Sequence, residues 1–293
     1  MSRKDGSALA RVWTQSANHP GLPAGNPGAG RSIVCFHGAE SHSGWFGPFA
    51  LDALGAGHWS AVIARDRPGW RGDLRSRAEA YAWIAGSLAE ARRDQPSGHG
   101  IDVIATSWGA LAVLACLIDC GSAGWENVKT IHLVAPAIFP DRGLQRLMLV
   151  GAIKDSIAGG GFLSGRLRTM LDPSHFSDCP DLRSRLAADP RRNMELSPAF
   201  WIVTAGMRRV VRHGASSHIL RSRLRDTGTR LFLHLAEQDS VIDLPRTEDF
   251  LTRAGAGLFR YPSRCHAIVM QYPMDFARAM ASCLSDEGAM RES

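Results

Sequence analysis

The sequence predicts an α/β fold, with a mostly parallel central sheet and helices on both of its faces. First, short apolar runs alternate with segments of helical length through both ends of the chain. Second, runs such as 32–36 and 61–64 are short and continuously apolar, which is typical of buried strands. Third, 45% of the 293 residues are hydrophobic and 21% are charged, an ordinary globular balance for one large domain or a core with an insertion.

The expected elements follow one another along the chain. The strands that we expect are 10–14, 32–36, 61–64, 101–105, 130–135, 230–235 and 257–261. The helices that we expect are 46–56, 77–94, 110–119 and 273–284. The first strand is expected at an edge of the sheet, and the stretch 18–30 after it is rich in Pro and Gly, which indicates a loop.

The stretch from 136 to 225 breaks this alternation. It consists of helical segments separated by turns that contain Gly or Pro, such as 159–161 and 189–190. We therefore expect a helical cap at 136–225, inserted into an α/β core that comprises residues 1–135 and 226–293.

The positive charge of the chain is concentrated in the expected cap. The whole chain has a formal charge of +6, whereas 136–225 alone holds fifteen Arg or Lys and seven Asp or Glu residues. We interpret this charge as a solvated helical surface; the alternative is attraction of an anionic substrate or peripheral contact with a lipid membrane. Most apolar cap residues are expected to pack on the core, and the candidates for a substrate pocket include Phe139, Phe162 and Trp201.

Several classes of function lack support in the sequence. No nucleic-acid-binding motif is present, so we expect no nucleic-acid partner. The six cysteines lack disulfide or zinc spacing and no dinucleotide-binding glycine motif is present, so we expect no metal and no cofactor. No apolar stretch follows the charged N-terminus and the longest apolar run, 110–118, is too short to span a bilayer, so we expect a cytoplasmic location.

The segment 105–109, Ala-Thr-Ser-Trp-Gly, joins an expected strand to an expected helix. A nucleophilic serine on such a sharp turn needs small neighbours, usually in the pattern Gly-x-Ser-x-Gly. Gly109 matches this pattern, whereas Ala105 replaces the first glycine. Ser107 is therefore the candidate nucleophile; the alternative is a serine that only caps the helix.

A serine hydroxyl needs a base to remove its proton, and the base needs a carboxylate to orient it. His266 follows the last expected strand and precedes the terminal helix, so it is the candidate base. Asp239 follows the preceding strand and is the candidate carboxylate. Asp141 and Asp243 remain alternatives, although Asp243 is better explained as the N-cap of a helix.

The transition state of acyl transfer carries an oxyanion, which needs preorganised N–H donors. One candidate donor is the backbone N–H of Trp108, next to the nucleophile. The other is the N–H of Ala39 in the loop after the strand at 32–36. We interpret His37 in the same loop as a side chain that orders the loop and not as a second base.

These segments carry a resemblance to a known family. The segment 37–45 resembles the His-Gly-x-x-Glu-His-Ser-x-aromatic loop of the monoacylglycerol lipase and lysophospholipase branch of the α/β hydrolases. The segments 66–69, 107–109 and 237–242 are similar to the Asp-x-x-Gly turn, the nucleophile elbow and the acid loop of that family. His266 falls where its catalytic histidine falls.

The resemblance covers about 31–140 and 228–284 and does not extend to the cap. The chain departs from the family pattern at Ala105 and Ala236, which stand where the family has glycine, and in the register of Glu40 and His42. The resemblance implies the α/β-hydrolase fold and hydrolysis of a carboxylic ester, often that of a lipid.

We therefore expect a serine hydrolase that cleaves a small-molecule carboxylic ester through an acyl-enzyme. The resemblance favours a monoacylglycerol or a lysophospholipid as substrate. The alternatives are a thioesterase, an acyltransferase or a lactonase, which share the acyl-enzyme step, and a non-enzymatic member of the fold that binds a ligand.

Overall fold

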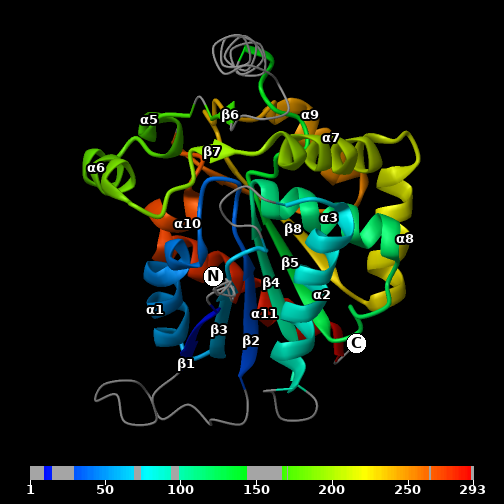
Figure 1. Ribbon diagram of the computed structural model, residues 1–293. Helices are drawn as coiled ribbons and strands as arrows, with labels where there is room; N and C mark the ends of the chain where they lie inside the picture. Colours follow the sequence, from blue (N-terminus) through cyan, green and yellow to red (C-terminus); the bar gives the residue numbers. More distant parts are fainter. Residues whose placement is uncertain are drawn as a thin grey trace, which may run out of the picture.

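A seven-stranded sheet with the order β1-β3-β2-β4-β5-β8-β9 forms the centre of the protein (Figure 1). The computed structural model describes residues 10–14, 30–68, 74–93, 99–143, 167–169, 171–263 and 265–291. The strands of the sheet are β1 (Ala10–Thr14), β2 (Arg31–Phe36), β3 (Trp59–Arg65), β4 (Ile101–Thr106), β5 (Val128–Val134), β8 (Arg230–Ala236) and β9 (Gly257–Tyr261). Within this sheet, edge strand β1 alone runs antiparallel to its neighbour.

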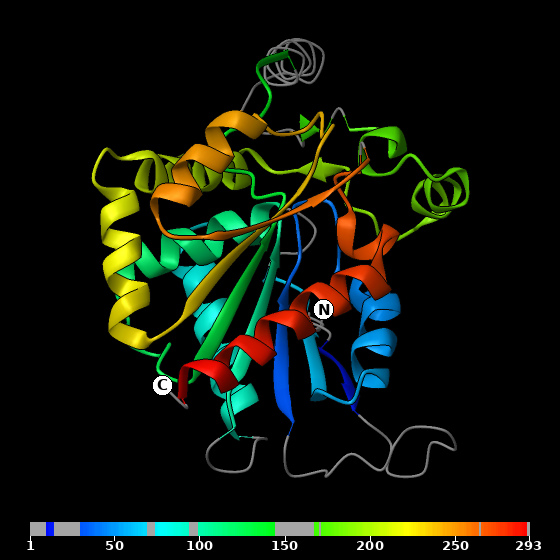
Figure 2. The ribbon, with the colours of Figure 1, turned by 180° about the vertical axis from the view of Figure 1, so that it is seen from behind.

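Helices cover both faces of the sheet (Figures 1 and 2). One face carries α2 (Arg77–Arg93), α3 (Trp108–Cys120), α8 (Ser216–Thr227) and α9 (Leu244–Arg253). The other face carries α1 (Gly47–Gly55), α10 (Ile268–Gln271) and α11 (Pro273–Arg291), with the short 3-10 helix η1 (Ser43–Phe46) before α1. The mostly parallel sheet with helices on both faces, predicted from the sequence, is confirmed.

Covering both faces explains why the strands are continuously apolar. In β2, Val34 and Phe36 contribute to the core on the α3 side, whereas Ile33 and Cys35 contribute to the core on the α1 side. Successive side chains of a strand point to opposite faces, so a strand buried on both faces is apolar wherever its side chains have no buried polar partner.

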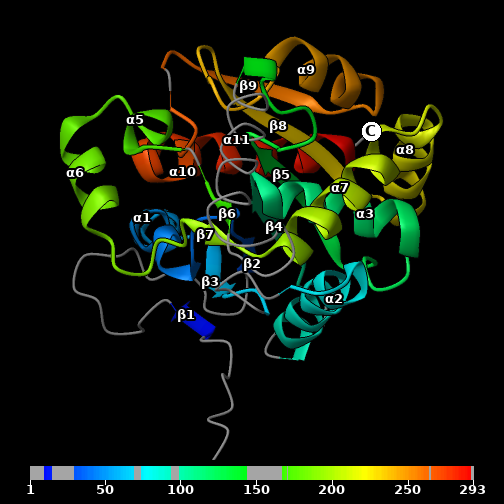
Figure 3. The same cartoon turned by 45° about the horizontal axis from the view of Figure 1, so that its top comes forward.

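The described residues of the segment between β5 and β8, as far as α7 (Pro198–Arg212), lie across the carboxyl ends of the strands, whereas α8 returns along one face of the sheet (Figures 1 and 3). The segment holds α5 (Pro173–Phe176), α6 (Pro180–Ala188), α7 and α8. We expected helices here, and the structure adds a short antiparallel pair of strands, β6 (Leu167–Arg168) and β7 (Glu195–Leu196). The apolar faces of α7 and α8 pack against α3 in the same cluster as the sheet, so this end of the expected cap takes part in core packing.

A chain of hydrogen bonds between buried side chains crosses the sheet from β9 to β4. Tyr261 Oη lies 3.0 Å from His234 Nδ1, and His234 Nε2 lies 2.9 Å from His132 Nδ1. His132 Nε2 lies 3.1 Å from Thr130 Oγ1, which in turn donates to Asp102 Oδ1 at 2.7 Å. The chain satisfies polar groups that are otherwise surrounded by apolar side chains.

The carboxylate of Asp102 sets the direction of this chain. Burial raises the pKa of Asp102, and the guanidinium of Arg31 opposes the shift. An ionised carboxylate only accepts, so Thr130 donates to it and accepts in turn from His132 Nε2–H. His132 Nδ1 then accepts from His234 Nε2–H, which leaves His234 Nδ1 to accept the hydroxyl proton of Tyr261. Both imidazoles are therefore neutral in the folded protein.

We expect the free energy of unfolding to fall as the pH is lowered from about 7 to about 5, because the unfolded histidines bind protons below about pH 6.5. Burial lowers the pKa of His132 to about 3 and that of His234 well below its usual value, so the folded state does not bind these protons. Each buried histidine then contributes a slope of up to about 1.4 kcal/mol per pH unit.

Urea unfolding of wild type and His234→Gln across this pH range tests the expectation. The unfolding free energy of His234→Gln should depend less steeply on pH, by the contribution of one histidine. The matched control is His218→Gln, which replaces an exposed histidine on α8 and should keep the wild-type slope. Equal slopes in wild type and His234→Gln would contradict the neutral state of the buried pair.

Candidate active site

Ser107 lies on a strained turn between β4 and α3. Its φ of 50° and ψ of −111° form a combination that L residues rarely adopt. Two hydrogen bonds hold the turn: Ser107 N–H donates to Val134 O at 2.8 Å, and Ser107 O accepts from Ala137 N–H at 3.1 Å. The Ser107 side chain makes no capping hydrogen bond to α3, which excludes the interpretation of Ser107 as a helix-capping serine.

Gly109 allows the beginning of α3 to approach the end of β2. A Cβ at this position would lie 2.5 Å from Phe36 O and 2.7 Å from His37 O, closer than any side chain can come to backbone. The other small residue of the elbow, Ala105, is buried near the end of β4, where it pairs with Phe36. The fold therefore requires glycine at position 109, two residues after Ser107, and accommodates the methyl group of Ala105, two residues before it.

Ser107, His266 and Asp239 form a continuous hydrogen-bonded array. Ser107 Oγ lies 2.9 Å from His266 Nε2, and His266 Nδ1 lies 2.7 Å from Asp239 Oδ2. The carboxylate accepts from Nδ1–H, so Nε2 is left to accept the serine proton. Asp239 Oδ1 accepts from Val241 N–H at 2.7 Å, which holds the carboxylate in place.

The two alternative carboxylates lie elsewhere. Asp243 Oδ1 accepts from Arg246 N–H at 3.2 Å and caps α9, as the sequence suggested. Asp141 is joined to the acid loop through its backbone, because its N–H donates to Val241 O at 2.9 Å. Of the three candidate carboxylates, the structure brings Asp239 to His266.

The loop after β2 touches the nucleophile. A Cβ on Gly38 would lie 3.2 Å from the Cβ of Ser107. His37 orders this loop: its Nε2 accepts from Arg67 N–H at 3.0 Å, so Nδ1 is the protonated nitrogen that donates to Gly38 O at 2.9 Å. Burial lowers the pKa of His37 to about 3, which keeps the ring neutral.

Two backbone N–H groups beside Ser107 are available to a ligand. Within the described part of the chain, neither the N–H of Ala39 nor that of Trp108 has a hydrogen-bond acceptor. Trp108 opens α3, where the helix dipole favours negative charge. Arg67 Nη2 donates to Ala39 O at 3.0 Å and so fixes the loop peptides. These are the two N–H groups that the sequence suggested for an oxyanion.

The same loop is clamped to the segment between β5 and β8. Glu40 Oε2 accepts from Arg192 Nε at 2.9 Å and from Arg192 Nη2 at 2.7 Å, and both side chains are buried. Burial raises the pKa of Glu40, and the Arg192 guanidinium opposes this shift. His42 Nε2 and Trp45 Nε1 both meet Asp189 Oδ2, at 2.9 Å and 2.8 Å. The polar residues of the loop thus act as structural partners of the segment above the sheet.

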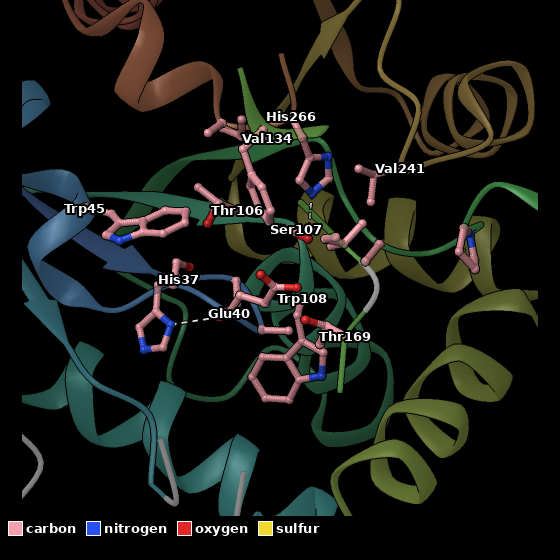
Figure 4. A pocket seen from close by; sticks show the side chains of 18 of the residues that line it. His37, Glu40, Trp45, Thr106, Ser107, Trp108, Val134, Thr169, Val241 and His266 are labelled. Atoms are coloured by element: carbon pink, nitrogen blue, oxygen red, sulfur yellow. Dashed lines mark hydrogen bonds between the residues drawn. The ribbon is translucent and has the colours of Figure 1, made fainter. Parts of the chain in front are cut away.

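Ser107 and His266 open onto a cavity of about 710 Å³ (Figure 4). Trp45 and Val241 lie on opposite sides of Ser107 in this view. The side of Trp45 is apolar and is lined by Trp45, Phe46, Phe176, Ile268, Val269 and Met270. The Val241 side is defined by contacts among lining residues: Pro140 pairs with Ile242, next to Val241, and Ala137 O accepts from Arg208 Nε. Trp201 and Thr204 line the cavity from the same helix as Arg208, α7. Ser107 therefore lies between an apolar wall and a wall that also carries polar and charged side chains.

The three residues suggested for substrate binding have different positions. Trp201 lines the cavity. Phe139 does not: its ring packs against Phe250, with the guanidinium groups of Arg212 and Arg246 against it, so this suggestion is corrected. Phe162 lies outside the described residues.

Contacts to Trp108, which follows Ser107, come from residues that sequence reasoning missed. Trp108 Nε1 donates to Thr204 Oγ1 on α7 at 2.8 Å. The guanidinium of Arg67 lies 5.4 Å from the ring centre of Trp108 and 4.7 Å from that of Phe200. No local motif surrounds Thr204 or Phe200, so their part in the site follows only from the packing of α7.

Nowhere in the described ranges do three His, Cys, Asp or Glu side chains gather so as to hold a metal ion. None of the described helices combines the length and apolar character that crossing a bilayer requires.

We expect Gly109→Ala to destabilise the protein by at least about 2 kcal/mol, because the added methyl group overpacks backbone that cannot move aside. The matched control is Gly86→Ala on α2, where a Cβ meets nothing within 4 Å. This control should stabilise the protein by about 0.5–1 kcal/mol, since alanine favours a helix. Urea unfolding measures both; a neutral Gly109→Ala would contradict the close approach.

The chain matches the family described as serine aminopeptidase, S33, over residues 29–271. No match to the chain is found among curated proteins.

Similar solved structures come from several organisms. A soluble variant of monoglyceride lipase from Saccharomyces cerevisiae, in complex with a substrate analog, has a TM-score of 0.70 and 14% identity over 94% of this chain and 91% of that chain. The monoacylglycerol lipase of Paleococcus ferrophilus has a TM-score of 0.65 and 19% identity over 95% and 98%. A putative non-heme bromoperoxidase of Mycobacterium tuberculosis has a TM-score of 0.64 and 13% identity over 96% of both chains. At such identities the likeness establishes a shared fold alone.

Proposed function

Because the chain belongs to the serine aminopeptidase S33 family of α/β hydrolases, we propose that it hydrolyses a carboxylic ester through an acyl-enzyme on Ser107. The family and the shared fold confirm the α/β-hydrolase prediction. The observation that carries the proposal is the hydrogen-bonded array of Asp239, His266 and Ser107 at the edge of a partly apolar cavity.

The geometry supports a two-step acyl transfer. Ser107 Oγ attacks the ester carbonyl carbon while His266 Nε2 takes the hydroxyl proton. The negative charge on the carbonyl oxygen is stabilised by the N–H groups of Ala39 and Trp108. His266 then returns the proton to the leaving alcohol, which departs from an acyl-Ser107. Water, activated by His266, attacks the acyl group and releases the carboxylic acid, while Asp239 keeps its hydrogen bond to His266 Nδ1.

The cavity favours an ester over an aminopeptidase substrate. An aminopeptidase must bind the α-ammonium group of its substrate, which calls for a carboxylate without another partner. The one carboxylate among the described lining residues is Glu40, and Arg192 already holds it. The apolar side around Trp45 and Phe176 suits an acyl chain instead. Together with the monoacylglycerol lipases of the same fold, this favours a lipid-like monoacylglycerol or lysophospholipid ester.

We expect a fluorophosphonate probe to label the wild-type protein and to leave Ser107→Ala unlabelled, because the probe reacts with an activated serine hydroxyl. Ser107→Ala should also lose at least about 10⁴-fold in kcat on a p-nitrophenyl ester. A panel of an ester, an acyl-CoA and a lactone compares the acyl-transfer alternatives. Full activity of Ser107→Ala, or a preference for the thioester or the lactone, would overturn the proposed reaction.

We expect Asp239→Asn to lower kcat by about 10⁴-fold, because an amide at this position favours the wrong tautomer of His266. Asp141→Asn is the matched control and should keep wild-type activity, since its side chain does not reach His266. Steady-state kinetics on one p-nitrophenyl ester measure both variants. A large loss in Asp141→Asn with little loss in Asp239→Asn would exchange the roles of the two residues.

A further inference from the structure

Arg208 brings a positive charge to the cavity without an acidic partner in the part of the chain that the structure describes. It lies on α7, is partly buried, and lines the Val241 side of the cavity. Its Nε donates to Ala137 O at 3.0 Å, and in the described ranges no acidic side chain forms an ion pair with it. Arginine side chains of the same segment do form such pairs, as Arg192 does with Glu40 and Arg191 with Asp66.

Two hydrogen bonds fix Arg208 relative to the nucleophile. Ala137 O accepts from Arg208, and Ala137 N–H donates to Ser107 O at 3.1 Å. The bond from Nε uses one of the five guanidinium N–H groups. The groups on Nη1 and Nη2 have no acceptor in the described part of the chain, so they remain for a ligand. A ligand group held by Arg208 would thus lie close to the reacting ester.

Arg208 keeps its charge although burial and a neighbouring positive charge disfavour the charged form. Burial and the neighbouring Arg212 lower the pKa of Arg208 to about 10, so the guanidinium is still protonated at neutral pH. Arg212 itself is directed to Ile138 O, away from the cavity wall. A charge removed from water without a counter-ion is unfavourable, and an anion bound in the cavity would relieve that cost.

The described lining of the cavity has an unbalanced positive charge. It includes three arginines, Arg142, Arg168 and Arg208. The one carboxylate among the described lining residues, that of Glu40, is neutralised by Arg192. The opposite side, around Trp45, is apolar. The two sides of Ser107 therefore suit the two parts of a substrate that has an apolar chain and a negative group.

We propose that the natural ester carries an oxyanion, either a phosphate or a carboxylate, in its alcohol part, and that Arg208 binds this group while the acyl chain occupies the apolar side. The inference rests on the proposed ester hydrolysis and adds to it a substrate class and a specificity-determining residue. A guanidinium suits both oxyanions because its N–H groups form paired hydrogen bonds with their oxygens.

Three esters with one acyl chain test the inference: monodecanoylglycerol, monodecanoylglycerol phosphate and decanoyloxypropanoate. The quantity measured is the ratio of kcat/KM for each anionic ester to that for the neutral one. We expect wild type to prefer one of the anionic esters, which identifies the phosphate or the carboxylate as the natural group. Arg208→Gln should lower that ratio by at least about tenfold, and Arg208→Lys should lose less. Comparing two substrates in the same variant cancels any general damage to the site.

The matched control is Arg209→Gln, which removes an equal charge from the exposed neighbour on the same helix. This control should leave the ratio at its wild-type value, because Arg209 does not line the cavity. An equal fall in the ratio for Arg209→Gln would assign the effect to long-range charge and overturn the role of Arg208.

The remaining outcomes separate this inference from the proposed function. Hydrolysis of the neutral ester with the same ratio in wild type and Arg208→Gln would overturn the anion site and leave ester hydrolysis intact. Hydrolysis of none of the three esters would contradict the proposed function. Titration calorimetry with decyl phosphate and with inorganic phosphate then tests the site independently of turnover. Equal affinity of wild type and Arg208→Gln for decyl phosphate would overturn the anion site.

Discussion

The close approach of α3 to the end of β2 is the constraint on which the rest of the site depends. Gly109 permits this approach, because any Cβ there would overlap the carbonyl oxygens of Phe36 and His37. The same approach brings the loop after β2 against Ser107, where the backbone adopts a positive φ. One packing contact between a helix and a strand thus brings Ser107 together with the N–H groups of Ala39 and Trp108, the proposed oxyanion donors.

The segment between β5 and β8 is part of the site's framework as well as its cover. Thr204 on α7 accepts from the indole of Trp108, and Arg67 lies against both Trp108 and Phe200. On the other side of the cavity, Arg192 holds Glu40 of the loop after β2. Because α7 and the loop are both tied to the elbow, a displacement of this segment would disturb the array of Ser107, His266 and Asp239 as well as the cavity wall.

Several arginines of the segment between β5 and β8 have partners inside the molecule, so the positive charge of this segment is not all on its surface. A solvated surface accounts for only part of it, since Arg191 pairs with Asp66 and Arg192 with Glu40 inside the molecule. Arg208 and Arg212 donate to backbone carbonyl groups near the elbow. A count of charges along the sequence treats all of these residues alike, although their electrostatic surroundings differ completely.

The sequence by itself determined the features that depend on neighbours along the chain. Apolar runs of strand length and the small residues around Ser107 indicated the sheet and the elbow, because strand pattern and turn sterics are local. The tertiary structure decided what depends on distant residues. It brought Asp239 and not Asp141 to His266, and turned Phe139 toward Phe250 and away from the cavity. Among the described residues, it gave Arg208 a backbone carbonyl as partner and no acid. Spacing places such residues at the same edge of the sheet, but only packing decides the direction of each side chain and the partner that it meets.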